Sequence, residues 1–140
     1  MTSVRPDVRD FFQRFQSAGD NLDNEALASL FSSVFLSLDP KSAAAVSPHA
    51  LLAVLPRRKQ LFQAIGGDGL ELADISETPL DDLHTLVRTS WRLLMNYQAP
   101  RDPIFLLSTF ILRMEEGAWR IVLYLNHQDL AKLFSELAPA

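Results

Sequence analysis

The sequence contains no cysteine among its 140 residues, which excludes disulfides, thiolate metal sites and thiol nucleophiles. It has no apolar run near the roughly 18 residues that cross a membrane. Its first residues, Met-Thr-Ser-Val-Arg-Pro-Asp, lack the apolar core of a signal peptide. From these absences we expect a cytoplasmic protein that does not bind membranes.

Basic residues are also scarce, with 13 Lys and Arg against 17 Asp and Glu and a formal net charge of -4. This balance gives no electrostatic footprint for nucleic acid. Among only five glycines, the stretch Gly66-Gly67-Asp68-Gly69 lacks the lysine of a phosphate-binding loop. His49, His84 and His127 lie in separate predicted elements, without the i, i+4 spacing of a helical metal site. The sequence therefore predicts no nucleic-acid partner, no cofactor and no metal.

The remaining composition, 48% hydrophobic and 21% charged, is typical of one soluble globular domain. Apolar stripes predict helices over 8–16 and 25–32, and alternating or apolar runs predict strands over 34–38 and 70–80. Between them, Ser47-Pro48 starts a helix that Pro56 is expected to divide, because an interior proline breaks the hydrogen-bond ladder. A final helix follows Asn126. This order of elements predicts an α+β fold.

The clearest pattern is a β-meander with strands over 87–95, 104–114 and 119–125. The stretch Glu115-Glu116-Gly117 supplies its second turn. Because side chains alternate across a strand, each run divides into two faces. The first face is nearly all apolar and is expected to meet the helices. Its members are Val87, Thr89, Trp91, Leu93, Met95, Ile104, Leu106, Ser108, Phe110, Leu112, Met114, Trp119, Ile121, Leu123 and Leu125.

The second face carries all four arginines of the meander together with large apolar residues. This face is too polar to form a core, and its large apolar residues are unfavourable in contact with water. The pattern favours an oligomer interface, with two sheets packed back to back in a homodimer; the alternative is a solvated sheet face. The residues expected at the interface are Arg88, Phe105, Leu107, Ile111, Val122 and Tyr124.

Several motifs together resemble a known superfamily. They are the helix pair with its acidic turn, the strand ending in Leu38-Asp39-Pro40, the Ser-Pro helix and the closing Glu-Gly-x-Trp-Arg-Ile-Val. In this combination the chain resembles the nuclear transport factor 2-like superfamily, which includes the SnoaL-like proteins, over nearly all of residues 1–140. The resemblance implies a single cystatin-like cone, in which a curved antiparallel sheet wraps around N-terminal helices, with an interior pocket and frequent dimers.

Asp39 is the sharpest catalytic candidate that the resemblance provides. Its position resembles that of the carboxylate base of ketosteroid isomerases, which moves a proton next to a carbonyl. Those enzymes also use a tyrosine and a protonated aspartate to stabilise the oxyanion. Here Phe12 or Phe15 falls at the tyrosine position and Phe110 at the aspartate position. Since each missing donor costs about 2.7–4 kcal/mol of transition-state binding, isomerase chemistry of that kind is disfavoured.

Three functions remain open from the sequence. The first is binding of a small hydrophobic ligand in the apolar cone. The second is an isomerase, dehydratase or cyclase that uses Asp39 as general base with His49 or His84. The third is protein interaction through the outer sheet face, with the cone packed shut. The residues expected to line the ligand site are Phe12, Phe15, Thr89, Trp91, Ser108, Phe110 and Trp119.

Overall fold

The computed structural model describes residues 3–21, 23–95 and 103–137. The helices and strands follow in the order α1 (Pro6–Asp20), α2 (Asn24–Ser29), β1 (Phe31–Leu38), β2 (Ala43–Val46), α3 (Pro48–Ala64), β3 (Gly67–Pro79), β4 (His84–Met95), β5 (Phe105–Glu115), β6 (Ala118–Asn126) and α4 (Leu130–Leu137). None of the helices in these ranges is long and apolar enough to span a membrane.

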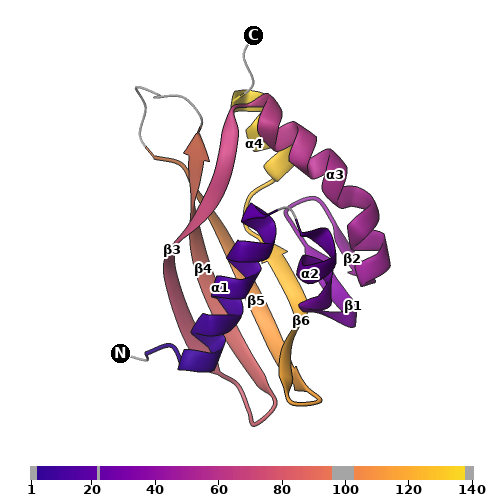
Figure 1. The fold of residues 1–140 in the computed structure, drawn as a ribbon, viewed down its shortest axis with the longest axis vertical. Coiled ribbons are helices and arrows are strands. Elements are labelled where there is room, and N and C mark those ends of the chain that lie inside the picture. Colours follow the sequence, from indigo (N-terminus) through magenta and orange to yellow (C-terminus); the bar gives the residue numbers. More distant parts are fainter. Residues whose placement is uncertain (1–2, 22, 96–102, 138–140) are drawn as a thin grey trace.

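The strands form one curved sheet in the order β2-β1-β6-β5-β4-β3. Neighbouring strands are antiparallel except β1 and β6, which run parallel. Figure 1 shows α1, α2 and α3 on the concave side of the sheet, with α4 beside α3 at one end. The predicted α+β fold with a sheet wrapped around N-terminal helices is therefore confirmed. The sheet is larger than the four-stranded one expected, because β1 and β2 extend it beyond β6.

The helix starts follow from local sequence. Proline occupies the first turn of α1 and α3, where a missing N–H costs no hydrogen bond. Asp23 caps α2 by accepting a hydrogen bond from the Ala26 N–H at 3.0 Å, and Ser47 caps α3 by accepting one from the Ala50 N–H at 3.2 Å. The apolar stripe of α1 then faces the sheet and buries Val8, Phe11 and Phe12.

Pro56 does not divide the third helix, contrary to the sequence prediction. α3 runs without interruption through this residue. The proline leaves the Leu52 carbonyl without its usual helical donor. Because Pro56 is exposed, water can satisfy the freed backbone at this position. Local chemistry therefore tolerates a residue that normally breaks a buried helix.

A tight turn joins β5 to β6, as predicted. Glu116 and Gly117 have positive φ values of 51° and 80°, and the flanking residues Glu115 and Ala118 pair across the ladder. Two central residues with positive φ define the two-residue hairpin turn that matches the twist of a sheet.

Beyond Ile121, the side chains of β6 point to the opposite faces of the sheet from those predicted. The register of β5 and β6 shifts there, so that Val122 is an extra residue between the Leu112–Ile121 and Ile111–Leu123 pairs. The bulge reverses the alternation. Tyr124 consequently points to the concave side and stacks on Phe110, so its expected place in the outer interface was wrong. Leu123 and Leu125 take the outward positions instead.

Candidate functional site

The concave face holds a cluster of aromatic rings where the sequence predicted a ligand site. Phe12 and Phe15 of α1 meet Phe110 of β5 at centroid distances of 5.0 and 5.5 Å. Trp91 lies 5.7 Å from Phe15, and Tyr124 lies 4.8 Å from Phe110. Phe12 and Phe110 are 0% exposed. These rings, which we call the ring cluster, fill the space between α1 and the sheet.

The polar groups of the concave face are bonded to one another. Trp91 Nε1 donates to Thr89 Oγ1 at 2.8 Å, and Thr89 Oγ1 donates to the Ser108 carbonyl at 3.0 Å. Ser108 Oγ in turn donates to Asn126 Oδ1 at 3.2 Å. Thr89, Trp91 and Ser108 thus come together on the concave face, and their hydrogen bonds stabilise the buried sheet.

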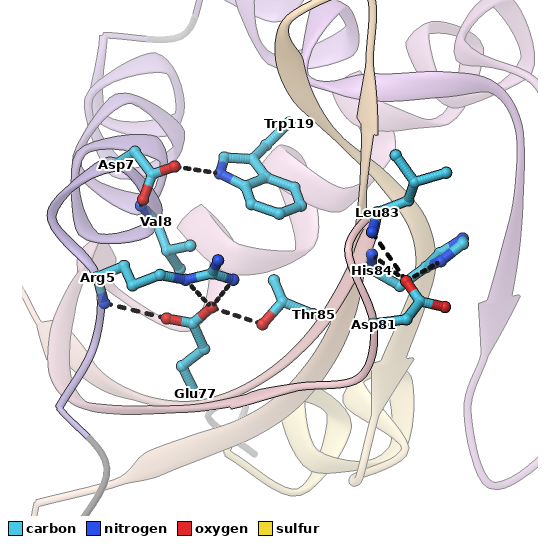
Figure 2. A network of polar contacts seen from close by, with 9 residues as sticks. All are labelled: Arg5, Asp7, Val8, Glu77, Asp81, Leu83, His84, Thr85 and Trp119. Atoms are coloured by element: carbon cyan, nitrogen blue, oxygen red, sulfur yellow. Dashed lines mark hydrogen bonds and ion pairs between the residues drawn. The ribbon is translucent and has the colours of Figure 1, made fainter.

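Trp119 lies away from the ring cluster, in a polar network that sequence reasoning missed (Figure 2). Its Nε1 donates to Asp7 Oδ2 at 2.9 Å, and the Arg5 guanidinium carbon lies 5.4 Å from the ring centre. Arg5 also pairs with Glu77, whose side chain is only 1% exposed. Glu77 Oε1 accepts from the Arg5 backbone N–H at 3.0 Å, and its Oε2 accepts from Thr85 Oγ1 at 2.6 Å.

This network fixes the start of α1 to β3, because Arg5 is the residue that precedes the helix. Burial alone raises the pKa of Glu77, but the hydrogen bonds from Arg5 and Thr85 outweigh burial and hold the pKa below its ordinary value. Glu77 is therefore a paired, ionised carboxylate, whose role here is to position α1 over the sheet.

Asp39 lies in the exposed turn between β1 and β2. Its Oδ1 accepts from the Lys41 N–H at 2.8 Å and the Ser42 N–H at 2.9 Å, and its Oδ2 accepts from Ser42 Oγ at 3.1 Å. The Lys41 N–H, helped by Ser42, lowers the pKa of Asp39 below its ordinary value. The structure thus gives this carboxylate a turn-forming role and makes it a weaker base than a free one.

Replacing Asp39 with alanine is expected to cost about 1 kcal/mol of unfolding free energy, since the turn loses its acceptor. Asp39→Asn should cost less because its carbonyl oxygen can still accept from the two N–H groups. Chemical denaturation of both variants measures the difference. Equal losses in the two variants would contradict the turn role.

The structure does not bring the three catalytic candidates together. His49 is exposed in the first turn of α3. His84 begins β4, and its Nδ1 lies 2.9 Å from Asp81 Oδ1 (Figure 2). His84 pairs with Arg113 near the β5–β6 turn, whereas Leu38, beside Asp39, pairs with Leu125 at the far end of β6. Across the described ranges, no hydrogen bond joins any two of these candidates, and no cluster of acids and histidines is placed to hold a metal.

The outer face of the sheet presents a continuous line of aliphatic side chains. Leu36 pairs with Leu123, Leu123 with Ile111, and Ile111 with Leu86, so four adjacent strands contribute one residue each. We call these four residues the apolar row. Further along β5, Phe105 and Leu107 are 43% and 48% exposed. Arg88 and Arg92 flank these residues on β4 and are exposed.

The hydroxyl of Thr109 connects this face to the segment after β6. Thr109 Oγ1 lies 2.7 Å from His127 Nε2, and the Leu107 N–H donates to Gln128 Oε1 at 2.9 Å. His127, the third histidine, therefore holds a local structural position beside the outer face. The segment after β6 is thereby fixed against the edge of the exposed apolar surface.

No protein-family model and no curated protein matches the sequence. Solved structures do match. An NTF-2 like protein of unknown function from Shewanella oneidensis aligns with a TM-score of 0.69 at 14% identity, covering 87% of this chain and 97% of that chain. An NTF2-like protein with a cystatin-like fold from Novosphingobium aromaticivorans gives 0.70 at 16% identity, covering 96% and 88%. Aln2 from a Streptomyces species gives 0.69 at 14% identity, covering 96% and 99%.

These similarities establish the architecture of the molecule. The chain has the nuclear transport factor 2-like, cystatin-like fold, as the resemblance in its sequence predicted. Identities this low define the fold alone, and one fold hosts many activities. The function of this chain therefore depends on its own surfaces and side chains.

Proposed function

We propose that this chain is a cytoplasmic protein-interaction module that forms a homodimer through the outer face of its sheet. The supporting observation is the apolar row, which crosses four strands on the side of the sheet opposite α1, α2 and α3 (Figure 1). Contiguous apolar surface of this kind marks interaction sites on soluble proteins. The proposed interface contains Arg88, Phe105, Leu107 and Ile111 of the expected set, with Leu123 in the place assigned to Tyr124.

The arrangement of charges on this face suits a two-fold contact. An interface normally has an apolar centre and a polar rim. Here the apolar row and Leu107 provide the centre, while Arg88 and Arg92 provide part of the rim. In a two-fold dimer each patch meets its own copy, so the apolar centres can pack together while the long arginine side chains extend to water at the edge.

Leu107→Lys is expected to weaken the dimer by at least about tenfold, because it places a charge in the apolar centre. Val54→Lys on α3 is the matched control: Val54 is 46% exposed and Leu107 is 48% exposed, but Val54 lies off the sheet. Sedimentation of the wild type at high micromolar concentration should give twice the 15.7 kDa chain mass. A monomeric wild type, or equal effects of the two variants, would refute the proposed interface.

Binding of a small hydrophobic ligand inside the cone has less support from the geometry. The concave face is apolar, as such a site requires. However, Phe12 and Phe110 contact each other and are fully buried, so a ligand could enter only if the ring cluster parted. Catalysis by Asp39 has less support still, because hydrogen bonds within the turn hold its carboxylate.

A further inference from the structure

A polar groove lies between α1 and β3, at the edge of the sheet. The groove is open to solvent and has a volume of about 540 Å³, within the usual range of ligand sites. α1 contributes Gln13, Gln16 and Asp20 to its walls, and β3 contributes Glu71 and Leu72. Because β3 is the last strand in the sheet order, no strand in the described ranges pairs with its outer edge.

The main chain of β3 is directed into this groove. The Leu72 N–H donates to the side-chain Oε1 of Gln16 at 3.1 Å, so it points away from β4. In an antiparallel pair the N–H and C=O of a residue point to the same side, and the direction repeats every second residue. Leu70 fits this pattern, because its partner Leu93 donates its own N–H to Ile104 on the other side. The backbone N–H and C=O groups of Leu70 and Leu72 therefore point away from β4, toward the outer edge of β3, and Leu72 also lines the groove.

Gln16 occupies the position that a further strand would take. Its carboxamide oxygen accepts the hydrogen bond that a backbone carbonyl accepts in a ladder. Gln16 itself is only half-buried and belongs to a flexible residue type, so an incoming backbone can displace it. The bond shows that this edge of β3 already binds an amide group.

The charge around the groove favours a positively charged ligand. Asp68, Glu71 and Asp74 are exposed on β3, which carries no lysine or arginine. Asp20 adds a carboxylate from the α1 wall, and among the described residues of the lining Arg9 is the cation. Arg92 of β4 lies opposite Glu71 in the ladder and offsets part of this negative charge. An extended chain bearing lysine or arginine would place its cations beside these carboxylates.

We propose that the groove binds an extended, lysine- or arginine-bearing peptide segment of another protein by β-strand addition to β3. The peptide backbone pairs with Leu70 and Leu72, and one of its carbonyls replaces Gln16 at the Leu72 N–H. Its basic side chains contact Glu71 and the neighbouring acids. Binding here does not require the proposed dimer, because the site lies on the edge of the sheet and on α1, although Glu71 lies opposite Arg92 of the dimer rim.

The test uses the full chain labelled with nitrogen-15 and an octapeptide of alternating threonine and lysine. We expect its addition to shift the amide resonances of Leu70, Glu71 and Leu72. The same peptide with N-methyl groups on alternate residues should bind at least about tenfold more weakly, because it cannot form the ladder. An octapeptide of alternating threonine and glutamate should also bind at least about tenfold more weakly than the lysine peptide, because its charge is reversed.

Two exposed acids provide the protein controls. Glu71→Lys should weaken binding of the lysine peptide by about tenfold or more, whereas Glu136→Lys on α4 should leave it unchanged. Absence of binding, equal binding of the N-methylated peptide, or resonance shifts confined to other strands would overturn the proposal. Equal affinity of the Glu71→Lys variant would overturn it as well.

Discussion

Replacing Phe110 with alanine is expected to lower the free energy of unfolding by about 3–5 kcal/mol, the usual cost of removing a buried phenylalanine. Phe110 is 0% exposed and packs against Phe12, Phe15 and Tyr124 at once. The loss has two parts, the missing apolar contact and the cavity that the surrounding rings cannot fill. Urea denaturation measures this loss of unfolding free energy, provided that the m-value is the same for the wild type and the variant.

Phe105→Ala is the matched control, since it removes the same side chain from the same strand. Phe105 is 43% exposed on the outer face, so the expected loss is below about 1 kcal/mol. Both variants are best compared in the Leu107→Lys background, where dimerisation does not contribute to stability. Similar losses in the two variants would show that the ring cluster is not the centre of the core.

Replacing Glu77 with alanine is expected to cost about 2–3 kcal/mol, because Thr85 and the Arg5 main chain lose a charged acceptor. The cost stays below the 3–5 kcal/mol of a fully buried pair, since the Arg5 side chain is 45% exposed and water can solvate it. Asp10→Ala is the control, because its ion pair with Arg14 is exposed and is worth little.

The same residue predicts a dependence on pH. The pKa of Glu77 is lower in the folded chain than its ordinary value, so the ionised carboxylate stabilises the fold. That contribution is complete above the ordinary pKa and is lost as the pH falls through the lowered one. Glu77→Gln lacks this titration. The stability difference between wild type and Glu77→Gln should therefore shrink on acidification, and a constant difference would exclude the linkage.

The sequence predicted the parts of the fold that depend on local patterns. The alternation of β4 and β5, that of β6 as far as Ile121, and the stripe of α1 are strong, and all three were confirmed. β2 was missed because three of its four residues are alanine, which has little strand preference. Its pairing with β1 makes it a strand. The parallel pairing of β1 with β6 was not predicted either, because local sequence patterns do not reveal pairing between residues far apart in the chain.

The misplacement of Tyr124 and the failure to find Glu77 have the same physical cause, a β-bulge in the strand that carries each residue. An extra residue at Val122 turned Tyr124 inward, although simple alternation placed it outside. A second register shift between Leu72 and Asp74 turns Glu77 to the concave side, where it meets Arg5. A period-2 pattern cannot reveal either shift. The inward positions of Phe12 and Phe110 were predictable because both residues lie on uninterrupted patterns.

The parallel pairing of β1 with β6 also determines how the molecule can fold. Phe31 pairs with Ile121, so the first strand finds its neighbour only after nearly all the intervening sequence has been made. Contacts of such long sequence separation slow folding, because the loop must close before they form. During synthesis, β1 and the apolar stripe of α1 are made before the later strands on which they pack. In this interval the nascent chain exposes surface that invites aggregation, so its dependence on chaperones should exceed that of a helical protein of equal length.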